Sequence, residues 1–190
     1  ITALSKGNAT VTVSFAGNEN YTAAQNKTIS VTVSLKDASV SLNNATLDLL
    51  IGDEFIVVVT TNPEGLDVTF APDNSGVVGV DENGVVTAIK EGTATVKVSV
   101  GGDGVYTLNT TDVTVTVKKI PTEIHVDHNS LDLKVGDETV SVATLTPADA
   151  GNVTFTSSNS SVVIVDAEGN VIAEGKGQAI ITVFFAGDDK

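Results

Sequence analysis

The chain has 190 residues and a formal net charge of −14 at pH 7, with 24 acidic residues against 10 basic ones, all of them Lys. This charge argues against nucleic acid and an anionic membrane surface as partners, because both would repel the chain. Cys, Met and Trp are absent, so the fold has no disulfides. The Val-, Thr-, Ser-, Asn- and Gly-rich composition favours short strands joined by tight turns.

The first predicted elements are two strands close to the N-terminus. Val11–Phe15 and Ile29–Val33 place apolar residues at every second position, as half-buried strands do. No initiator Met and no visible signal peptide precede them. We therefore expect the chain to be a piece of a larger protein.

The elements that follow belong to a unit of about 85 residues that repeats. Gly7–Val13, Gly92–Val98 and Gly177–Val183 are versions of one motif, and their first glycines lie 85 residues apart. Further motifs recur in the same order: Leu47–Glu54 with Leu131–Glu138, Val68–Phe70 with Val153–Phe155, and Asp81–Gly84 with Asp166–Gly169.

The period predicts three segments. Residues 1–34 are the C-terminal strands of a preceding repeat and are called the first segment. Residues 35–119 are a complete repeat, the second repeat, and residues 120–190 are the third repeat, which lacks its last strand.

Within the second repeat, alternation continues in Val96–Val100 and Val113–Val117, whereas Phe55–Val59 is continuously apolar, as in a strand covered on both faces. That run is too short to cross a bilayer, so we expect no membrane insertion. Turn residues separate the runs, and no segment has a helical period. About seven short strands per repeat predict an all-β protein of tandem immunoglobulin-like β-sandwiches, with fibronectin-type topology as the alternative.

These motifs resemble the bacterial immunoglobulin-like repeats of group 2, which occur in surface adhesins of the intimin and invasin type and in adhesin-like proteins of gut microbes and methanogens. The resemblance covers almost the whole chain and rests on these stretches: Phe15–Tyr21, Leu47–Glu54, Val68–Phe70, Asp73–Gly76, Val80–Val96, Leu131–Glu138, Val153–Ser161 and Val165–Ile181. One departure is Phe70 and Phe155, where many members carry Trp. The resemblance implies a surface-exposed protein of many repeats and no particular receptor.

Acidic residues recur at the predicted ends of the repeats. Loop carboxylates suit Ca²⁺, a hard cation, where one repeat meets the next. The calcium candidates are Asp53, Glu54, Asp103, Asp137, Glu138 and Asp188. The alternative is that these loops are merely solvated, which is the commoner outcome for acidic turns. We expect no other cofactor.

The residues of the chain do not suggest catalysis. His125 and His128 lie three positions apart on a predicted strand and therefore point to opposite faces, and no Gly-x-Ser-x-Gly motif accompanies them. Asp81–Gly84 resembles the start of a calcium loop but lacks the closing glutamate. Asn83–Gly84 is instead a signal for a hairpin with a type I′ turn. We expect no enzymatic activity.

Seven Asn-x-Ser/Thr sequons are candidate glycosylation sites, although many arise by chance in a chain rich in Asn and Thr. Their asparagines are Asn8, Asn20, Asn26, Asn44, Asn109, Asn152 and Asn159.

The leading functional hypothesis is a stalk or spacer at the cell surface, outside the cell. Its partners would be neighbouring repeats of the same protein and, if the repeats themselves adhere, a host or microbial surface glycan or protein. The alternative is an accessory or carbohydrate-binding module of a secreted glycan-active enzyme. The absence of Trp and the position of Tyr21 and Tyr106 near repeat ends count against an aromatic platform for sugars.

The period also predicts two complementary defects. The third repeat has an open sheet edge, and residues 21–34 hold a closing strand without a sandwich of their own. We expect Ile29–Val33 of one molecule to add to the open edge of the third repeat of another.

Overall fold

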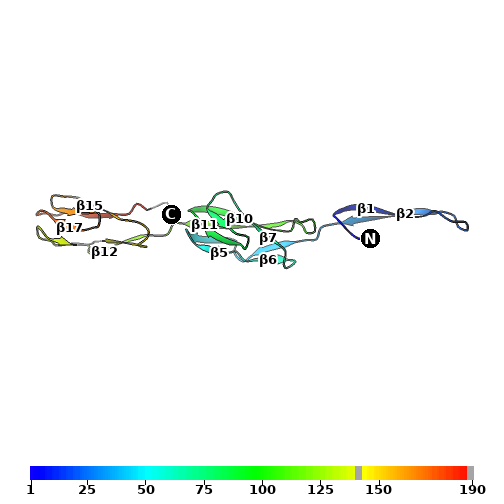
Figure 1. The fold of residues 1–190 in the computed structure, drawn as a ribbon, viewed down its shortest axis with the longest axis horizontal. Coiled ribbons are helices and arrows are strands. Elements are labelled where there is room, and N and C mark those ends of the chain that lie inside the picture. Colours follow the sequence, from blue (N-terminus) through cyan, green and yellow to red (C-terminus); the bar gives the residue numbers. More distant parts are fainter. Residues whose placement is uncertain (140–142, 188–190) are drawn as a thin grey trace. The chain divides into compact units, whose positions relative to one another are not determined.

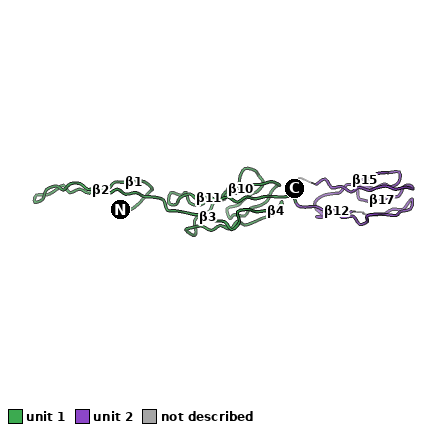
Figure 2. The backbone as a smooth tube through the Cα atoms, turned by 180° about the vertical axis from the view of Figure 1, so that it is seen from behind, with its two compact units in different colours: residues 1–119 green, residues 120–190 purple. Residues whose placement is uncertain are grey.

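The computed structural model describes residues 1–139 and 143–187, and the regular secondary structure of these residues is β strand throughout. The strands are labelled along the chain in Figure 1. The chain divides into two compact units, residues 1–119 and 120–190, which Figure 2 colours separately. Within the described ranges no helix has the length and apolarity needed to span a bilayer. The all-β class is confirmed.

The first segment forms an antiparallel hairpin of β1 (Gly7–Phe15) and β2 (Ala24–Val33). The side chain of Asn18 closes the turn, since its Oδ1 accepts hydrogen bonds from two backbone N–H groups of the turn, both at 3.0 Å. Apolar residues alternate on both strands, yet most of them are exposed, and Ile29 keeps 50% of its surface. The hairpin therefore has a long ladder, with one irregularity between Val13 and Phe15, and it lacks a hydrophobic core.

The second repeat is a two-layer β-sandwich. Its strands are β3 (Ser39–Leu42), β4 (Thr46–Leu50), β5 (Glu54–Ile56), β6 (Val59–Asn62), β7 (Val68–Pro72), β8 (Val78–Val80), β9 (Val85–Ala88), β10 (Gly92–Val100) and β11 (Asn109–Lys118). One layer has the order β4-β11-β10-β7, and the other consists of the pair β3-β6 and the sheet β5-β9-β8. β4 runs parallel to β11, and the remaining pairs are antiparallel. This is the predicted immunoglobulin-like sandwich.

The predicted strand Phe55–Val59 is interrupted in the structure. β5 pairs with β9 in one sheet and β6 pairs with β3, so the chain changes sheets at Val57 and Val58. The prediction that Phe55–Val59 is covered on both faces is wrong. Val57 is buried, whereas Ile56 and Val58 are 61% and 52% exposed, so the apolar run still alternates between core and solvent.

Branched aliphatic side chains fill the core of the second repeat. On β10 and β11 the valines at every second position are exposed by no more than 1%. Lys97 lies between two of them, is exposed, and approaches Asp112 of β11 to 4.0 Å. The same buried cluster includes Val78 and Val86 of the other layer, so the two sheets share one core.

Phe70 and Phe155, which replace Trp, lie against the glycine of a hairpin turn in each repeat. A Cβ on Gly84 would lie 2.6 Å from the ring of Phe70, and one on Gly169 would lie 2.8 Å from the ring of Phe155. Phe70 packs against the buried core of the second repeat, so the sandwich forms without a Trp at this position.

The hairpin that contains Gly84 is present, but its turn is not the predicted type I′ turn. The N–H of Gly84 donates to the carbonyl of Asp81 at 3.1 Å, and Gly84 has φ of +79°. These are features of a three-residue loop whose last residue is left-handed. The Asp81 carboxylate favours this loop, because its Oδ1 accepts the N–H groups of Asn83 at 2.9 Å and Val85 at 2.8 Å.

Within residues 120–139 and 143–187, the third repeat has fewer strands than the second, and none is longer than its counterpart. Its strands are β12 (Glu123–Val126), β13 (Glu138–Thr139), β14 (Ala143–Thr146), β15 (Thr154–Ser157), β16 (Val163–Val165), β17 (Val171–Ala173) and β18 (Ile181–Phe184). β12 pairs with β14, β15 pairs with β18, and β17 lies between β13 and β16. Residues 130–134, which correspond to β4, and residues 177–180, which correspond to the first half of β10, are not strands here.

Candidate functional site

The candidate calcium-binding residues of the second repeat, Asp53, Glu54 and Asp103, lie at the two ends of its sandwich. The chain enters at Lys36, whose N–H donates to the carbonyl of Val105 at 2.9 Å. It leaves at Lys118, whose carbonyl accepts the N–H of Ile51 at 3.0 Å. β11 runs from the first end to the second over 10 residues, so the two ends are about 30 Å apart.

At the first end, Asp103 shapes the turn between β10 and β11. Its Oδ1 accepts the N–H groups of Tyr106 at 2.8 Å and Val105 at 2.9 Å. These bonds, that of Tyr106 foremost, lower the pKa of Asp103 because they stabilise its charged form. The Nζ of Lys36 lies 5.7 Å from the centre of the Tyr106 ring. The carboxylate thus already has backbone partners in its own turn.

At the second end, Asp53 closes the turn between β4 and β5, and Asp137 closes the corresponding turn of the third repeat. The Oδ2 of Asp53 accepts the N–H of Leu50 at 2.8 Å, and that of Asp137 accepts the N–H of Lys134 at 2.9 Å. The recurrence of the Asp in Gly-Asp-Glu therefore has a structural cause. The following acids are exposed, and Glu54 meets the hydroxyl of Thr87 at 3.5 Å, while Glu138 begins β13.

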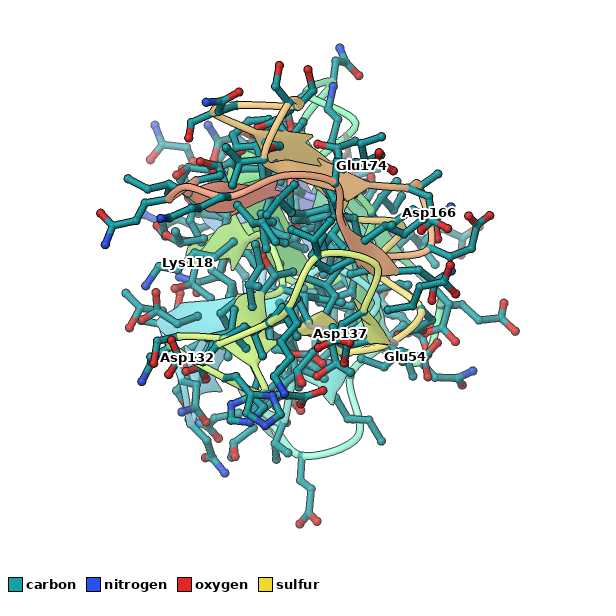
Figure 3. All side chains as sticks on the ribbon, turned by 90° about the vertical axis from the view of Figure 1, so that its left-hand side faces the viewer. Glu54, Lys118, Asp132, Asp137, Asp166 and Glu174 are labelled. Atoms are coloured by element: carbon teal, nitrogen blue, oxygen red, sulfur yellow. The ribbon has the colours of Figure 1, made fainter. Side chains whose placement is uncertain are left out.

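In residues 1–139 and 143–187, no three His, Asp or Glu side chains are grouped as a metal site requires. The exposed His125 of β12 and His128 beyond its end belong to no such group. In Figure 3, Asp132 and Asp166 lie on different sides of the third repeat. Asp188 lies outside the described residues. A calcium site formed by two neighbouring repeats therefore stays a prediction.

Six of the seven sequon asparagines are exposed: Asn8, Asn20, Asn26, Asn44, Asn152 and Asn159. Asn109 differs from them, because it is half-buried at the start of β11 and its Oδ1 accepts the N–H of Val40 at 3.1 Å. This bond joins β11 to β3 of the other layer. Among the sequon asparagines, Asn109 is thus the one whose side chain forms a hydrogen bond between the two layers of the sandwich.

A groove of about 780 Å³ runs along the third repeat. Leu131 and Leu133 line it on the segment that corresponds to β4, and Gly177, Ile181 and Val183 line it on the segment that corresponds to β10. In the second repeat β11 lies between β4 and β10. The groove therefore occupies the position that β11 fills there. Periodicity alone indicated an open edge, but the depth and lining of the groove depend on how the two segments are spaced.

Comparison with known proteins places the sequence among immunoglobulin-like domains. A family model described as "Bacterial Ig-like domain (group 2)" matches residues 38–108 and 120–188. An uncharacterised protein of Clostridium acetobutylicum is 32% identical over 128 residues, which are 66% of this chain and 13% of that protein. The chain thus spans about an eighth of the length of this curated relative.

Two of the solved structures that align with the chain are an S-layer protein and a protein of a glucan utilization locus. The S-layer protein SbsC aligns with 97% of this chain and 34% of its own, at 20% identity and a TM-score of 0.43. The protein SGBP-B of the mixed-linkage glucan utilization locus of Bacteroides ovatus, solved with a mixed-linkage heptasaccharide, aligns with 80% of this chain and 46% of its own. The identity in that case is 14% and the TM-score is 0.31.

Proposed function

The chain belongs to the family of bacterial Ig-like domains of group 2, and from this membership we propose that it is a non-enzymatic spacer in the stalk of a cell-surface protein. The observation that carries the proposal is the path of the chain through the second repeat. It enters beside Val105 and leaves beside Ile51, at opposite ends of β11. Each such sandwich adds about 30 Å between whatever precedes it and whatever follows it.

Three properties support a spacer over a catalyst. The second repeat closes its own core, so it needs no partner to remain folded. Its charged residues are exposed, which keeps an extended array soluble. Repeating the same domain lengthens the protein without requiring a different fold for each unit.

We keep the division into residues 1–34, 35–119 and 120–190 as part of this proposal, with neighbouring repeats of the same protein as its first partners. Binding to a host or microbial surface glycan or protein is an additional role that multiple copies would strengthen through avidity.

The spacer proposal is tested by lengthening the chain by one repeat. A second copy of residues 35–119 is inserted after Lys119, and small-angle X-ray scattering measures the maximum dimension of each protein. We expect an increase of about 30 Å or more, because entrance and exit lie at opposite ends of the inserted sandwich. An unchanged maximum dimension would show that the repeats pack side by side, which contradicts a spacer.

The surface location has its own test. Antibodies raised against the chain are expected to label intact cells of the organism that makes it. Labelling that requires lysed cells would reject the surface location and leave the spacer geometry untouched.

The alternative, a carbohydrate-binding accessory module, rests on exposed aromatic residues. Tyr21 is 70% exposed at the tip of the β1–β2 hairpin, whereas Tyr106 is half-buried beside Lys36. Phe15 and Phe184 are also exposed, by 47% and 60%, but Phe184 lies in a different segment of the chain from Phe15 and Tyr21, so no segment brings these three rings together in one platform. A glycan array probed with the whole chain is expected to show no binding, and a hit abolished by Tyr21→Ala would favour the alternative.

A further inference from the structure

We propose that the second repeat resists mechanical force, and that the ladder between β4 and β11 is the mechanical clamp that gives this resistance. The biological use of the clamp rests on the proposed spacer function, because a spacer in a stalk transmits the pull between the parts that it joins. The inference is drawn from residues 36–118, which form one sandwich around one core.

The first observation is that the entering segment of the second repeat runs alongside its last strand. Lys36 forms a parallel bridge with Tyr106, just before β11 begins. Further along, Thr46–Leu50 of β4 pair with residues 114–118 of β11, again in parallel (Figure 2). The entering segment and the last strand therefore run in the same direction from the entrance of the repeat to its exit.

The second observation is the direction in which a pull along the chain loads this ladder. The chain continues before Lys36 and after Lys118, at opposite ends of the paired segments. A pull on both sides draws β4 back toward its first residue and β11 forward past its last residue. Because the two strands are parallel, these movements slide one strand along the other, and all five pairs resist together. A pull across the strands would instead open the same pairs one after another.

The third observation is that the ladder has to break whichever end of the repeat yields. If the entrance yields, β3 leaves β6 and β4 leaves β11. If the exit yields, β11 has to leave β4 on one side and β10 on the other, where nine residues of β10 are paired with it. Complete extension along either route therefore breaks the β4–β11 ladder. The entrance has fewer pairs to break, so we expect rupture to begin there.

The fourth observation is that the core prevents the two strands from slipping past each other. Leu47 and Leu49 of β4 are 6% and 9% exposed, and they belong to the same buried cluster as Val115 and Val117 of β11. Neighbouring residues of a strand face opposite sides, so a slip by one residue would turn both leucines toward solvent. The core thus holds the register, and the pairs of the ladder break together.

Single-molecule force spectroscopy tests the direction of loading, because handles can be attached at chosen positions in a chain without Cys. With handles on Ser34→Cys/Ile120→Cys, the pull runs along the chain through the second repeat alone. With handles on Leu50→Cys/Lys118→Cys, the pull runs across one end of the ladder, where these exposed residues are partners. We expect unfolding in the first geometry to need a severalfold higher force than in the second. Equal forces would overturn the proposal.

The length released on unfolding shows that the whole repeat has been measured. An extended chain spans about 3.3–3.6 Å per residue, so the first geometry should release about 250–280 Å once a folded length of about 30 Å is subtracted. The second geometry encloses fewer residues and should release about 220–240 Å. Release of these lengths at the same low force in both geometries would show that the ladder does not resist the pull.

A proline substitution tests the ladder itself. The N–H of Asp53 donates to the carbonyl of Leu50 at 3.0 Å, and Gly52 has φ of +91°. These are features of a type II turn, whose second residue, here Ile51, is a favoured position for Pro. Ile51→Pro therefore keeps the turn and removes the N–H that donates to the carbonyl of Lys118 at 3.0 Å. We expect a lower unfolding force in the first geometry.

Ile51→Ala is the matched control for this substitution, because it shortens the side chain and keeps the N–H. We expect Ile51→Ala to unfold at a force closer to that of the unmodified repeat than Ile51→Pro does. An equal loss of force in the two variants would assign the effect to side-chain packing and contradict the hydrogen-bonded clamp.

Val86→Ala separates mechanical resistance from thermodynamic stability. Val86 is fully buried on β9, which pairs with β5 and β8 and takes no part in the clamp. Loss of two methyl groups there is expected to lower the urea midpoint. The unfolding force should stay close to that of the unmodified repeat, because forced unfolding follows the unfolding barrier and not the equilibrium stability.

A force that falls with the urea midpoint in Val86→Ala and stays unchanged in Ile51→Pro would overturn the clamp. That result would leave the spacer function intact, because small-angle scattering of the lengthened chain tests the spacer separately.

Discussion

Asp81 and Asp166 show how one side chain determines a turn at equivalent places in two repeats. Each Oδ1 accepts two backbone N–H groups, with distances of 2.9 and 2.8 Å at Asp81 and 3.1 and 2.7 Å at Asp166. The hydrogen bond from the N–H of Val85 is the main cause that lowers the pKa of Asp81, and the side-chain bond from Asn170 is the main cause for Asp166. The charged carboxylate is the form that the folded turn prefers.

This preference predicts a pH dependence of stability. A carboxyl group whose pKa is lower in the folded state stabilises the fold above its unfolded pKa of about 4 and loses that contribution as the pH falls through the folded pKa. Asp73, Asp81, Asp103 and Asp166 act in this direction. We expect urea midpoints to fall progressively below about pH 4. Asp81→Asn keeps an acceptor oxygen without the charge, so its midpoint should depend less on pH; an unchanged profile would contradict this assignment.

Gly84 tests the packing of Phe70 on the turn. A Cβ at this position would both occupy a left-handed backbone and lie 2.6 Å from the ring. Gly52 is the matched control, because it has φ of +91° and a Cβ added there would meet nothing within 4 Å. We expect Gly52→Ala to lower the free energy of unfolding by about 1–2 kcal/mol and Gly84→Ala by about 1–3 kcal/mol more. Equal losses in thermal unfolding would show that the ring moves freely.

At the scale of elements, a strand in this protein depends on its neighbours as much as on its own sequence. Leu47–Leu50 and residues 131–134 share the same Leu-Asp-Leu pattern, yet the first is part of β4 and the second is not a strand. The difference lies in the partner, because β4 pairs with β11 and the later segment has no such strand beside it among the described residues. Unpaired backbone finds its hydrogen bonds in water instead, which removes the constraint to stay extended.

Leucine truncation in the two segments measures this difference. Leu47 is 6% exposed and belongs to the buried cluster, so Leu47→Ala is expected to cost about 2–5 kcal/mol. Leu131 is half-buried, and Leu131→Ala is expected to cost about 1 kcal/mol in the monomer. Scanning calorimetry of dilute protein should assign each loss to a separate transition. Equal costs would mean that the groove is closed in solution.

At the scale of the whole molecule, the sandwich is the repeated unit, and in the second repeat the acidic turns of Asp53 and Asp103 lie at its two ends. Asp53 and Asp103 both bind backbone N–H groups of their own turns, and these bonds explain why the residues recur. A Ca²⁺ ion bound between two repeats would need further oxygen ligands, in addition to these carboxylates, from a turn of the neighbouring repeat.

Calorimetric titration with Ca²⁺ decides between the two roles. If acidic turns of successive repeats share an ion, millimolar Ca²⁺ should release or absorb heat and raise the melting temperature, and EDTA should reverse the shift. Asp53→Asn, which keeps the acceptor for Leu50, should weaken binding while it preserves the turn. No heat and an unchanged melting curve would leave the carboxylates with a structural role alone.

The sequence alone determined the strand content, the period of about 85 residues and the family. Alternation of valine with polar residues is a local property, and the repeat makes each motif visible more than once. The candidate residues Asp53, Asp103 and Asp137 were found in the same way, as recurring acids at turns. Their recurrence could not show whether the carboxylates bind backbone N–H groups or an ion, since both use the same oxygen atoms.

Only the tertiary structure decided where the chain changes sheets, which turn Asp81 closes and which residues line the groove. Phe55–Val59 looks uniformly apolar, but its burial depends on two different partner strands, β9 and β3. Asn109 looks like any other sequon until Val40 of the opposite layer donates to its side chain. Such features depend on contacts between residues far apart in the chain, and a local pattern carries no information about the partner that completes them.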